Sequence, residues 1–261
     1  MPQDFVPYEV VPGEYSKGLI LLCDHARNTI PQPYGTLGLP ACELERHIAY
    51  DIGAEMVMRG LAAELGVPAI MATFSRLLID PNRGEDDPTL IRQLYDGTII
   101  PGNYPLSEAE RKRRRDGFYR PYHEQVRRMI DDFLALDIIP AVIAVHSMTD
   151  RWNDLARPWQ LSVLWDSDPR LAGPLLKAFR ELPGVTVGDN EPYDGALAGD
   201  TMHQHCTSRG LSHALIEIRQ DLVREEKDAA QWVKTLAPII EKVSALPHNH
   251  VMLHHGSRTD R

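Results

Sequence analysis

Short aliphatic runs that lead into ionisable side chains constrain the fold of this 261-residue chain more than any other feature. The run Leu19–Leu22 is followed by Asp24 and His25, and a second run, over residues 140–145, ends in His146. Short apolar runs bounded by polar residues predict buried strands. In open α/β sheets, ligands bind at the edge where strands end. We therefore expect both histidines at the mouth of one site.

A third run, over residues 212–221, alternates between two faces. Because successive side chains of a strand point to opposite faces, Glu217 and Arg219 share one face. Ile216 and Ile218 share the other face. Three predicted strands thus end in, or carry, two histidines and a carboxylate.

Segments with helical periodicity separate these runs and indicate the fold class. In the first of them apolar residues recur at helical spacing, Gly66 is a suitable C-terminal cap, and Asp51 falls inside the predicted helix. The predicted strands cover residues 19–23, 68–74, 140–146, 160–165, 185–187 and 212–221. The predicted helices cover residues 42–65, 107–136 (interrupted at Pro121), 171–182 and 228–246. Alternating strands and helices predict a single α/β domain with a mainly parallel central sheet flanked by helices.

Three segments lack a regular pattern. Residues 1–18 are expected to be an irregular lead-in. Residues 84–106, rich in Gly and Pro, are expected to form a long loop of the kind that is often functional. The histidine-rich residues 247–261 are expected to be a disordered tail, so that the folded catalytic domain covers residues 1–246.

Composition narrows the classes of partner. A formal net charge of −9 argues against nucleic acid as the main partner. No apolar run approaches the roughly 18–20 residues that span a membrane, and the first residues do not resemble a signal peptide. Three cysteines at no zinc-finger spacing suggest a reducing compartment. We expect a cytoplasmic protein that acts on a small molecule.

The two histidines and an acid predict a metal site. Two histidines and one carboxylate, with a fourth position open, are typical of catalytic zinc. The third ligand is Asp51, Glu217 or another acid. Zinc lowers the pKa of bound water to about 7, and a second carboxylate off the metal can carry the proton to a leaving nitrogen. A Ser–His–Asp hydrolase is less attractive because the sequence has no Gly-x-Ser-x-Gly elbow.

Eight short phrases, in one order over about residues 19–225, carry a family resemblance. They are Cys23–Pro31, His47–Ala54, Ser75–Arg83, Asp96–Asn103, Pro121–His123, His146–Thr149, Gly188–Tyr193 and Ile216–Leu222. Together they resemble the N-formylglutamate amidohydrolase family. The resemblance implies a zinc-dependent exopeptidase-like α/β fold. It also implies hydrolysis of an N-acyl amide on an acidic amino acid, such as N-formyl-L-glutamate.

The wider superfamily includes zinc-dependent cell-wall amidases, and the order of their functional residues is similar here. That order implies His25, Asp51 and His146 as ligands of one zinc ion and Glu217 as the catalytic base. Two departures stand out. Asp51 occupies a position where the amidases usually have Glu, and Asn28 stands where carboxypeptidase-like enzymes have a ligand Glu. The second departure argues against Asn28 as a ligand and favours Asp51.

A substrate with carboxylates requires cations, and Arg forms bidentate pairs that Lys cannot copy. Other polar residues in the matching phrases and in nearby loops are candidates for orienting the substrate, stabilising an oxyanion or forming the pocket wall. The candidates are Arg76, Arg83, Arg219, Asn82, Asn103, His123, His203, His205, Asn190 and Tyr193. For each Arg, the alternative is a structural ion pair with a neighbouring Asp.

Two other functions stay open from the sequence. One is an amidase that acts on another N-acyl amino acid or on a cell-wall peptide, against which the absence of cell-wall-binding repeats counts. The other is a catalytically silent small-molecule-binding protein with the same fold, against which the intact His25, His146 and Glu217 count. The sequence leaves the oligomeric state open.

Overall fold

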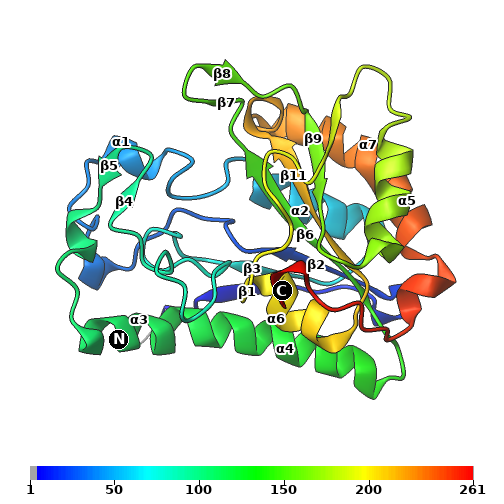
Figure 1. Cartoon of the computed structure of the whole chain (residues 1–261), viewed down its shortest axis with the longest axis horizontal. Helices are drawn as coiled ribbons and strands as arrows, with labels where there is room; N and C mark the ends of the chain where they lie inside the picture. Colours follow the sequence, from blue (N-terminus) through cyan, green and yellow to red (C-terminus); the bar gives the residue numbers. More distant parts are fainter. Residues whose placement is uncertain (1–4, 261) are drawn as a thin grey trace.

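A seven-stranded sheet forms the centre of the protein (Figure 1). The computed structural model describes residues 5–260. In spatial order, the strands are β1 (Tyr8–Val11), β3 (Ala69–Ala72), β2 (Leu19–Cys23), β6 (Ala141–Met148), β11 (His213–Arg219), β9 (Leu161–Leu164) and β10 (Val187–Asp189). The four pairs β3–β2, β2–β6, β6–β11 and β9–β10 are parallel. Only β1–β3 and β11–β9 are antiparallel among the strand pairs of this sheet within residues 5–260, so the predicted mainly parallel sheet is confirmed.

Helices cover both faces of the sheet (Figure 1). One face packs against α2 (Ala54–Leu65), α5 (Pro169–Phe179) and α7 (Glu226–Ser244). The other packs against the π-helical turn Arg115–Tyr119, which follows α3 (Glu108–Arg114), and against α4 (Arg120–Ala135) and α6 (Thr201–His205). None of the helices within residues 5–260 combines the length and apolarity that crossing a bilayer requires.

Burial on both faces explains why the central strands are continuous aliphatic runs. In β2, Leu19 and Leu21 point into the core under α2, whereas Ile20 and Leu22 point into the core under α4. A strand of a parallel sheet covered on both sides needs apolar side chains in both directions. The same side chains that made this strand recognisable in the sequence therefore hold it rigidly behind His25.

The first predicted helix is wrong in its first half. Residues 42–65 contain a short helix, α1 (Ala41–Leu44), and α2, separated by turns. Gly53, with φ of 84°, precedes α2, and a Cβ there would lie 2.2 Å from the backbone oxygen of Val223. Only glycine adopts this conformation and tolerates this approach. Asp51 consequently lies in a turn before the helix and not inside it.

Short strands occur where the sequence predicted irregular chain. β1 lies in the expected lead-in and pairs with β3 at the edge of the sheet. The hairpin β4 (Leu94–Tyr95) and β5 (Thr98–Ile99) lies in the expected long loop, and the hairpin β7 (Arg151–Trp152) and β8 (Leu155–Ala156) follows β6. Strands of two residues are too short to show a period of two in the sequence.

The C-terminal segment is ordered against the domain where we expected a disordered tail. Residues Pro247–His250 form a 3₁₀ helix, and Asn249 is fully buried. The side-chain amide of Asn249 donates from Nδ2 to Val243 O at the end of α7. Its Oδ1 atom accepts from Ser212 Oγ, and both distances are 2.7 Å. Arg258 binds Asp166 and Asp194. The segment through residue 260 thus satisfies buried polar groups, which anchors it.

Candidate active site

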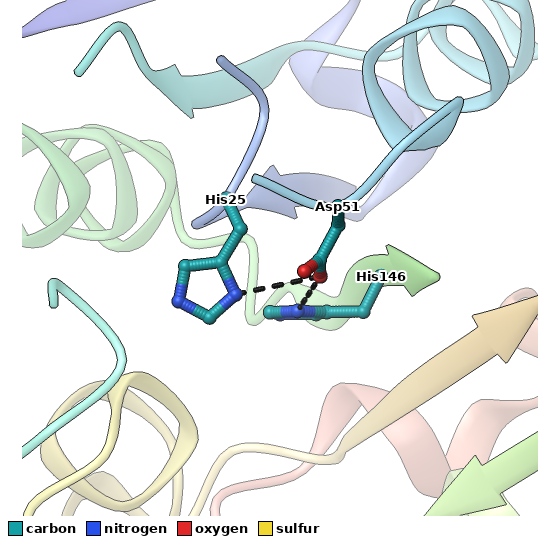
Figure 2. A group of neighbouring side chains, drawn as sticks. All are labelled: His25, Asp51 and His146. Carbon is teal, nitrogen blue, oxygen red and sulfur yellow. Dashed lines mark hydrogen bonds and ion pairs between the residues drawn. The ribbon is translucent and has the colours of Figure 1, made fainter. Parts of the chain in front are cut away.

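Three potential metal ligands meet at the sheet edge (Figure 2). His25 follows β2, Asp51 lies in the turn before α2, and His146 lies near the end of β6. Asp51 Oδ2 lies 2.8 Å from His146 Nδ1 and 3.4 Å from His25 Nδ1. Ligand atoms from all three residues lie within 4.8 Å of one another, and each residue is at most 4% exposed. The three residues form a group that can hold one metal ion.

Backbone contacts fix the turn that carries Asp51. The Asp51 amide donates to His25 O at 2.9 Å, so the turn is tied to the end of β2. Ser147 Oγ donates to Ile52 O at 2.7 Å, which ties the turn to β6 as well. These contacts explain how a residue from outside the sheet comes to lie between two histidines that the sheet positions.

Two further carboxylates hold the outer nitrogens of the histidines. His25 Nε2 lies 2.7 Å from Asp80 Oδ1, and His146 Nε2 lies 3.1 Å from Asp24 Oδ2. Each carboxylate accepts a hydrogen bond from the outer Nε2–H group, which leaves the lone pair of Nδ1 directed toward Asp51. Carboxylate–histidine pairs of this kind orient metal ligands and raise their basicity. The donor set therefore fits a divalent metal such as zinc.

The electrostatics of the cluster favour positive charge at its centre. Burial alone raises the pKa of the Asp24 carboxyl, but the hydrogen bond and the charge of His146 bring it to about 2. Burial lowers the pKa of His146, and the carboxylates of Asp24 and Asp51 raise it well above its ordinary value. Buried carboxylates thus surround the histidines, and a bound cation would be stabilised by the same charges.

The buried carboxyl of Glu217 lies beside this group. It occupies β11 directly opposite His146 in the parallel ladder, and it is 7% exposed. Its Oε2 atom has no hydrogen-bond partner among residues 5–260. Burial, reinforced by the charge of Asp51, raises the pKa of Glu217 to about 7 against the opposing effect of His146. A carboxyl poised near neutral pH is suited to accept and to donate a proton.

A cavity of about 490 Å³ opens over the four residues. Its volume suits a small-molecule ligand. Of the expected residues, it is lined by His25, Asp51, His146, Glu217, Arg76, Asn82, Arg83 and Tyr193. Arg92, which the sequence analysis overlooked, also lines it.

The arginines of the cavity differ in how far they are already neutralised. Arg76 donates to Asp51 Oδ1 at 3.2 Å and to Asp80 Oδ2 at 3.0 Å, so its charge is used within the site. Arg83 donates to Asn82 O, and Arg92 lies over the ring of Tyr95 at 4.5 Å. Neither Arg83 nor Arg92 forms an ion pair within the described part of the chain, which leaves them available to an acidic ligand.

The remaining expected contacts belong to the framework. Asn103 donates to backbone oxygens of Leu77 and Arg92, and Asn190 accepts from the amides of Trp165 and Gly195. His123 and His205 bond to each other at 2.8 Å, Arg219 pairs with Asp221, and His203 lines a different hollow. The side chains that do not line the cavity are Asn103, His123, Asn190, His203, His205 and Arg219. Framework bonds occupy most of these side chains, and a role for any of them in binding substrate stays a prediction.

Sequence reasoning missed several residues that support the site. Asp24 and Asp80 both lie in matching phrases of the sequence, yet their pairing with the outer histidine nitrogens depends on the folded geometry. Tyr122 and Thr201 in turn donate to Asp24, each at 2.7 Å. An acid next to a predicted ligand is the only signal that would have indicated Asp24.

Solved structures share this fold. A crystal structure of a gene product from Agrobacterium tumefaciens matches with a TM-score of 0.84 and 35% identity, covering 91% of this chain and 94% of that one. A crystal structure of N-formylglutamate amidohydrolase from Ralstonia eutropha matches with a TM-score of 0.68 and 23% identity, covering 95% of this chain and all of that one. At that identity, the second likeness supports the fold alone.

Sequence comparison gives the family. An N-formylglutamate deformylase from Pseudomonas putida is 36% identical over 80 residues, which cover 27% of this chain and 30% of that protein. The chain thus matches under a third of the length of that curated relative. The family model of N-formylglutamate amidohydrolase matches residues 17–224, which include all four residues of the site and both supporting carboxylates. This chain belongs to the N-formylglutamate amidohydrolase family.

Proposed function

We propose that the protein hydrolyses the N-formyl amide of an acidic amino acid such as N-formyl-L-glutamate, releasing formate and the free amino acid. The observation that carries the proposal is the buried Glu217 carboxyl beside the group of His25, Asp51 and His146, with an Oε2 atom that has no hydrogen-bond partner among residues 5–260. A base next to a metal-binding group, in a cavity with free cations, is the arrangement that hydrolysis of a charged amide requires.

His25, Asp51 and His146 would hold one divalent metal ion, and we propose zinc because two imidazoles and one carboxylate suit it. When bound, zinc supplies Lewis acidity and lowers the pKa of water. Asp80 and Asp24 keep the outer histidine nitrogens protonated, which presents Nδ1 of each ring inward. Arg76 holds Asp51 and Asp80 in place from one side.

Glu217 would move the proton. The Oε2 atom takes a proton from the attacking water as its oxygen adds to the formyl carbon. The same carboxyl then delivers the proton to the nitrogen as the C–N bond breaks, which yields formate and the amine. A pKa of about 7 lets one group serve both as base and as acid near neutral pH. The rigid strand β11 fixes the position of the carboxyl.

Arg83 and Arg92 would bind substrate carboxylate. Both line the cavity, and neither is neutralised by a carboxylate within residues 5–260. Arginine pairs with carboxylates in a bidentate geometry that orients the ligand as well as attracting it. The cavity would thereby place the formyl amide at Glu217 while the acidic end of the substrate lies against the arginines.

The test is a deformylase assay of the zinc-loaded protein on a panel of N-formyl and N-acetyl amino acids with acidic, neutral and basic side chains. We expect turnover of N-formyl amino acids with acidic side chains to exceed that of the others. Removal of the metal with a chelator should abolish the activity, and added zinc should restore it. Full activity in metal-free protein would contradict the metal requirement. Preference for a neutral or acetylated substrate would contradict the substrate class.

A further inference from the structure

Arg157 is a buried arginine whose charge no carboxylate neutralises within residues 5–260. Its side chain lies just after β8 and is 6% exposed. Neither Nε nor Nη1 has a hydrogen-bond partner in this part of the chain. The one side-chain hydrogen bond runs from Nη2 to the Tyr193 hydroxyl at 2.8 Å. Arg157 thus differs from the other arginines that are enclosed in the protein.

The comparison with Arg114 shows how unusual this environment is. Arg114, which is 2% exposed, binds the Glu110 carboxylate, the Asn103 side chain and two backbone oxygens. Arg76 binds two carboxylates. Burying a charge is unfavourable unless it is paired and hydrogen-bonded. Arg157 therefore carries donors and a charge that a ligand anion would satisfy.

The place of Arg157 connects it to the active site. Its amide donates to Asp150 O at 2.8 Å, and its backbone oxygen accepts from Arg219 Nη1 at 3.0 Å. Arg219 is two residues from Glu217 on β11, so the backbone of Arg157 is tied to the strand that carries the proposed base.

Tyr193 separates the guanidinium from the cavity. The Arg157 Cζ atom lies 4.9 Å from the centre of the Tyr193 ring, and this ring lines the same cavity as Glu217. Tyr193 is 44% exposed, so the core does not enclose its side chain. A ligand that displaces the ring would reach the free nitrogens of Arg157.

We propose that Arg157, covered by Tyr193 in the free enzyme, binds one carboxylate of the substrate and thereby selects acidic N-acyl amino acids. The proposal rests on the function proposed above. Arg83 and Arg92 supply cations from a separate segment of the chain, so the cavity offers two anion-binding positions. An N-acylated dicarboxylic amino acid carries two carboxylates, which matches this number.

The test uses the zinc-loaded full chain with Arg157→Gln and three substrates. N-Formyl-L-glutamate has both carboxylates, N-formyl-L-glutamine keeps only the α-carboxylate, and N-formyl-L-isoglutamine keeps only the side-chain carboxylate. Losing a buried charge-assisted pair should lower kcat/KM for N-formyl-L-glutamate by about 30-fold or more. For the monoamide that keeps the carboxylate bound by Arg157, kcat/KM of the variant should fall by as much. For the monoamide that lacks this carboxylate, kcat/KM should fall by less than about threefold. Equal losses on all three substrates would overturn the proposal and assign Arg157 a role through Glu217 or through the fold.

Binding provides a readout that does not need turnover. In calorimetry, Arg157→Gln should weaken binding of L-glutamate about 30-fold or more, and Arg157→Lys should restore part of it. Arg151→Gln, at an exposed arginine of the β7–β8 hairpin, is the matched control and should behave like the wild type. Thermal unfolding of Arg157→Gln should match the wild type, since only one side-chain hydrogen bond is lost. If Arg157→Gln unfolds, Arg157→Lys carries the substrate comparison.

The outcomes separate this proposal from the proposed function. Wild-type protein that binds L-glutamate through Arg157 but hydrolyses none of the N-formyl substrates would refute the proposed function and leave the anion site. Wild-type protein that hydrolyses N-formyl-L-glutamate, with an Arg157→Gln variant of unchanged kcat/KM and unchanged affinity for L-glutamate, would refute the role of Arg157 alone.

Discussion

Glu217→Gln tests the proposed chemistry most directly. The substitution keeps the size of the side chain and removes the carboxylate that accepts the proton. Positioned proton transfer contributes about 10²–10⁴ in rate, so we expect kcat to fall at least about a hundredfold. Metal content should stay at the wild-type level, because His25, Asp51 and His146 are untouched. Stopped assays of formate release and metal analysis of the purified variant measure both quantities.

The raised pKa of Glu217 sets the pH dependence of the reaction. Because burial brings the pKa of this carboxyl to about 7, the base loses its proton only near neutral pH. We expect kcat/KM of the wild type to fall as the pH drops below about 7. The residual activity of Glu217→Gln should lack this dependence. A pH profile of both proteins from pH 5 to pH 9 provides the comparison.

The same shift has a signature in folding stability. In metal-free protein, a carboxyl whose pKa is higher in the folded state stabilises the fold most below its ordinary pKa of 4.5. This contribution is lost as the pH rises through about 7. Raising a pKa from 4.5 to about 7 corresponds to about 3 kcal/mol. The wild type should therefore lose stability between pH 5 and pH 8, and Glu217→Gln should not. The free energy of unfolding of the variant minus that of the wild type should be larger at pH 8 than at pH 5.

Two results would refute this reasoning. Near-normal turnover of Glu217→Gln would show that another group moves the proton. Loss of metal from the variant would make Glu217 a ligand and exclude Asp51 as the third one. Glu241→Gln is the matched control, because Glu241 is an exposed residue of α7 that pairs only loosely, at 4.0 Å, with Lys17. It should leave turnover, metal content and unfolding unchanged.

Three further predictions concern the surrounding residues. His25→Ala and His146→Ala should each lose the bound metal, as measured by elemental analysis, and full metal content in both would place the site elsewhere. Asp80→Asn should weaken metal binding about 10–100-fold in a chelator competition, because the outer nitrogen of His25 loses its carboxylate. A metal affinity within about twofold of the wild type would contradict this prediction. Arg83→Ala or Arg92→Ala should raise KM for acidic substrates more than for uncharged ones, whereas equal increases would indicate a structural role.

The parts of the site that the sequence predicted are those positioned by the central strands. His25, His146 and Glu217 each lie in or next to a strand that is buried on both faces, and such strands are visible as aliphatic runs. The family resemblance supplied Asp51, which no pattern of its own marked as a ligand. Its true position in a turn was hidden because helical periodicity continued across Gly53, whose backbone conformation interrupts the helix.

The parts that the sequence missed depend on contacts between distant segments. Asp80 becomes a partner of His25 only when the chain after β3 folds back over the end of β2. Arg157 has no neighbour in the sequence that marks it, and its significance is that no carboxylate within residues 5–260 pairs with its buried charge. Conversely, Asn103 and Arg219 lie in the matching phrases, and in the folded protein their side chains bond to backbone oxygens of the framework. A motif alone does not separate these roles.

The ordered C-terminal segment has a practical consequence for protein engineering. Arg258 pairs with Asp194, which is one residue from Tyr193 and lines the cavity, so the end of the chain reaches the rim of the active site. Removing residues after 246 would also remove the hydrogen bond from Ser212, just before β11, to Asn249. A truncation chosen to shed histidines that scavenge metal would therefore remove contacts that support the candidate site. Substitution of His254 and His255, both exposed, is the gentler way to reduce adventitious metal binding.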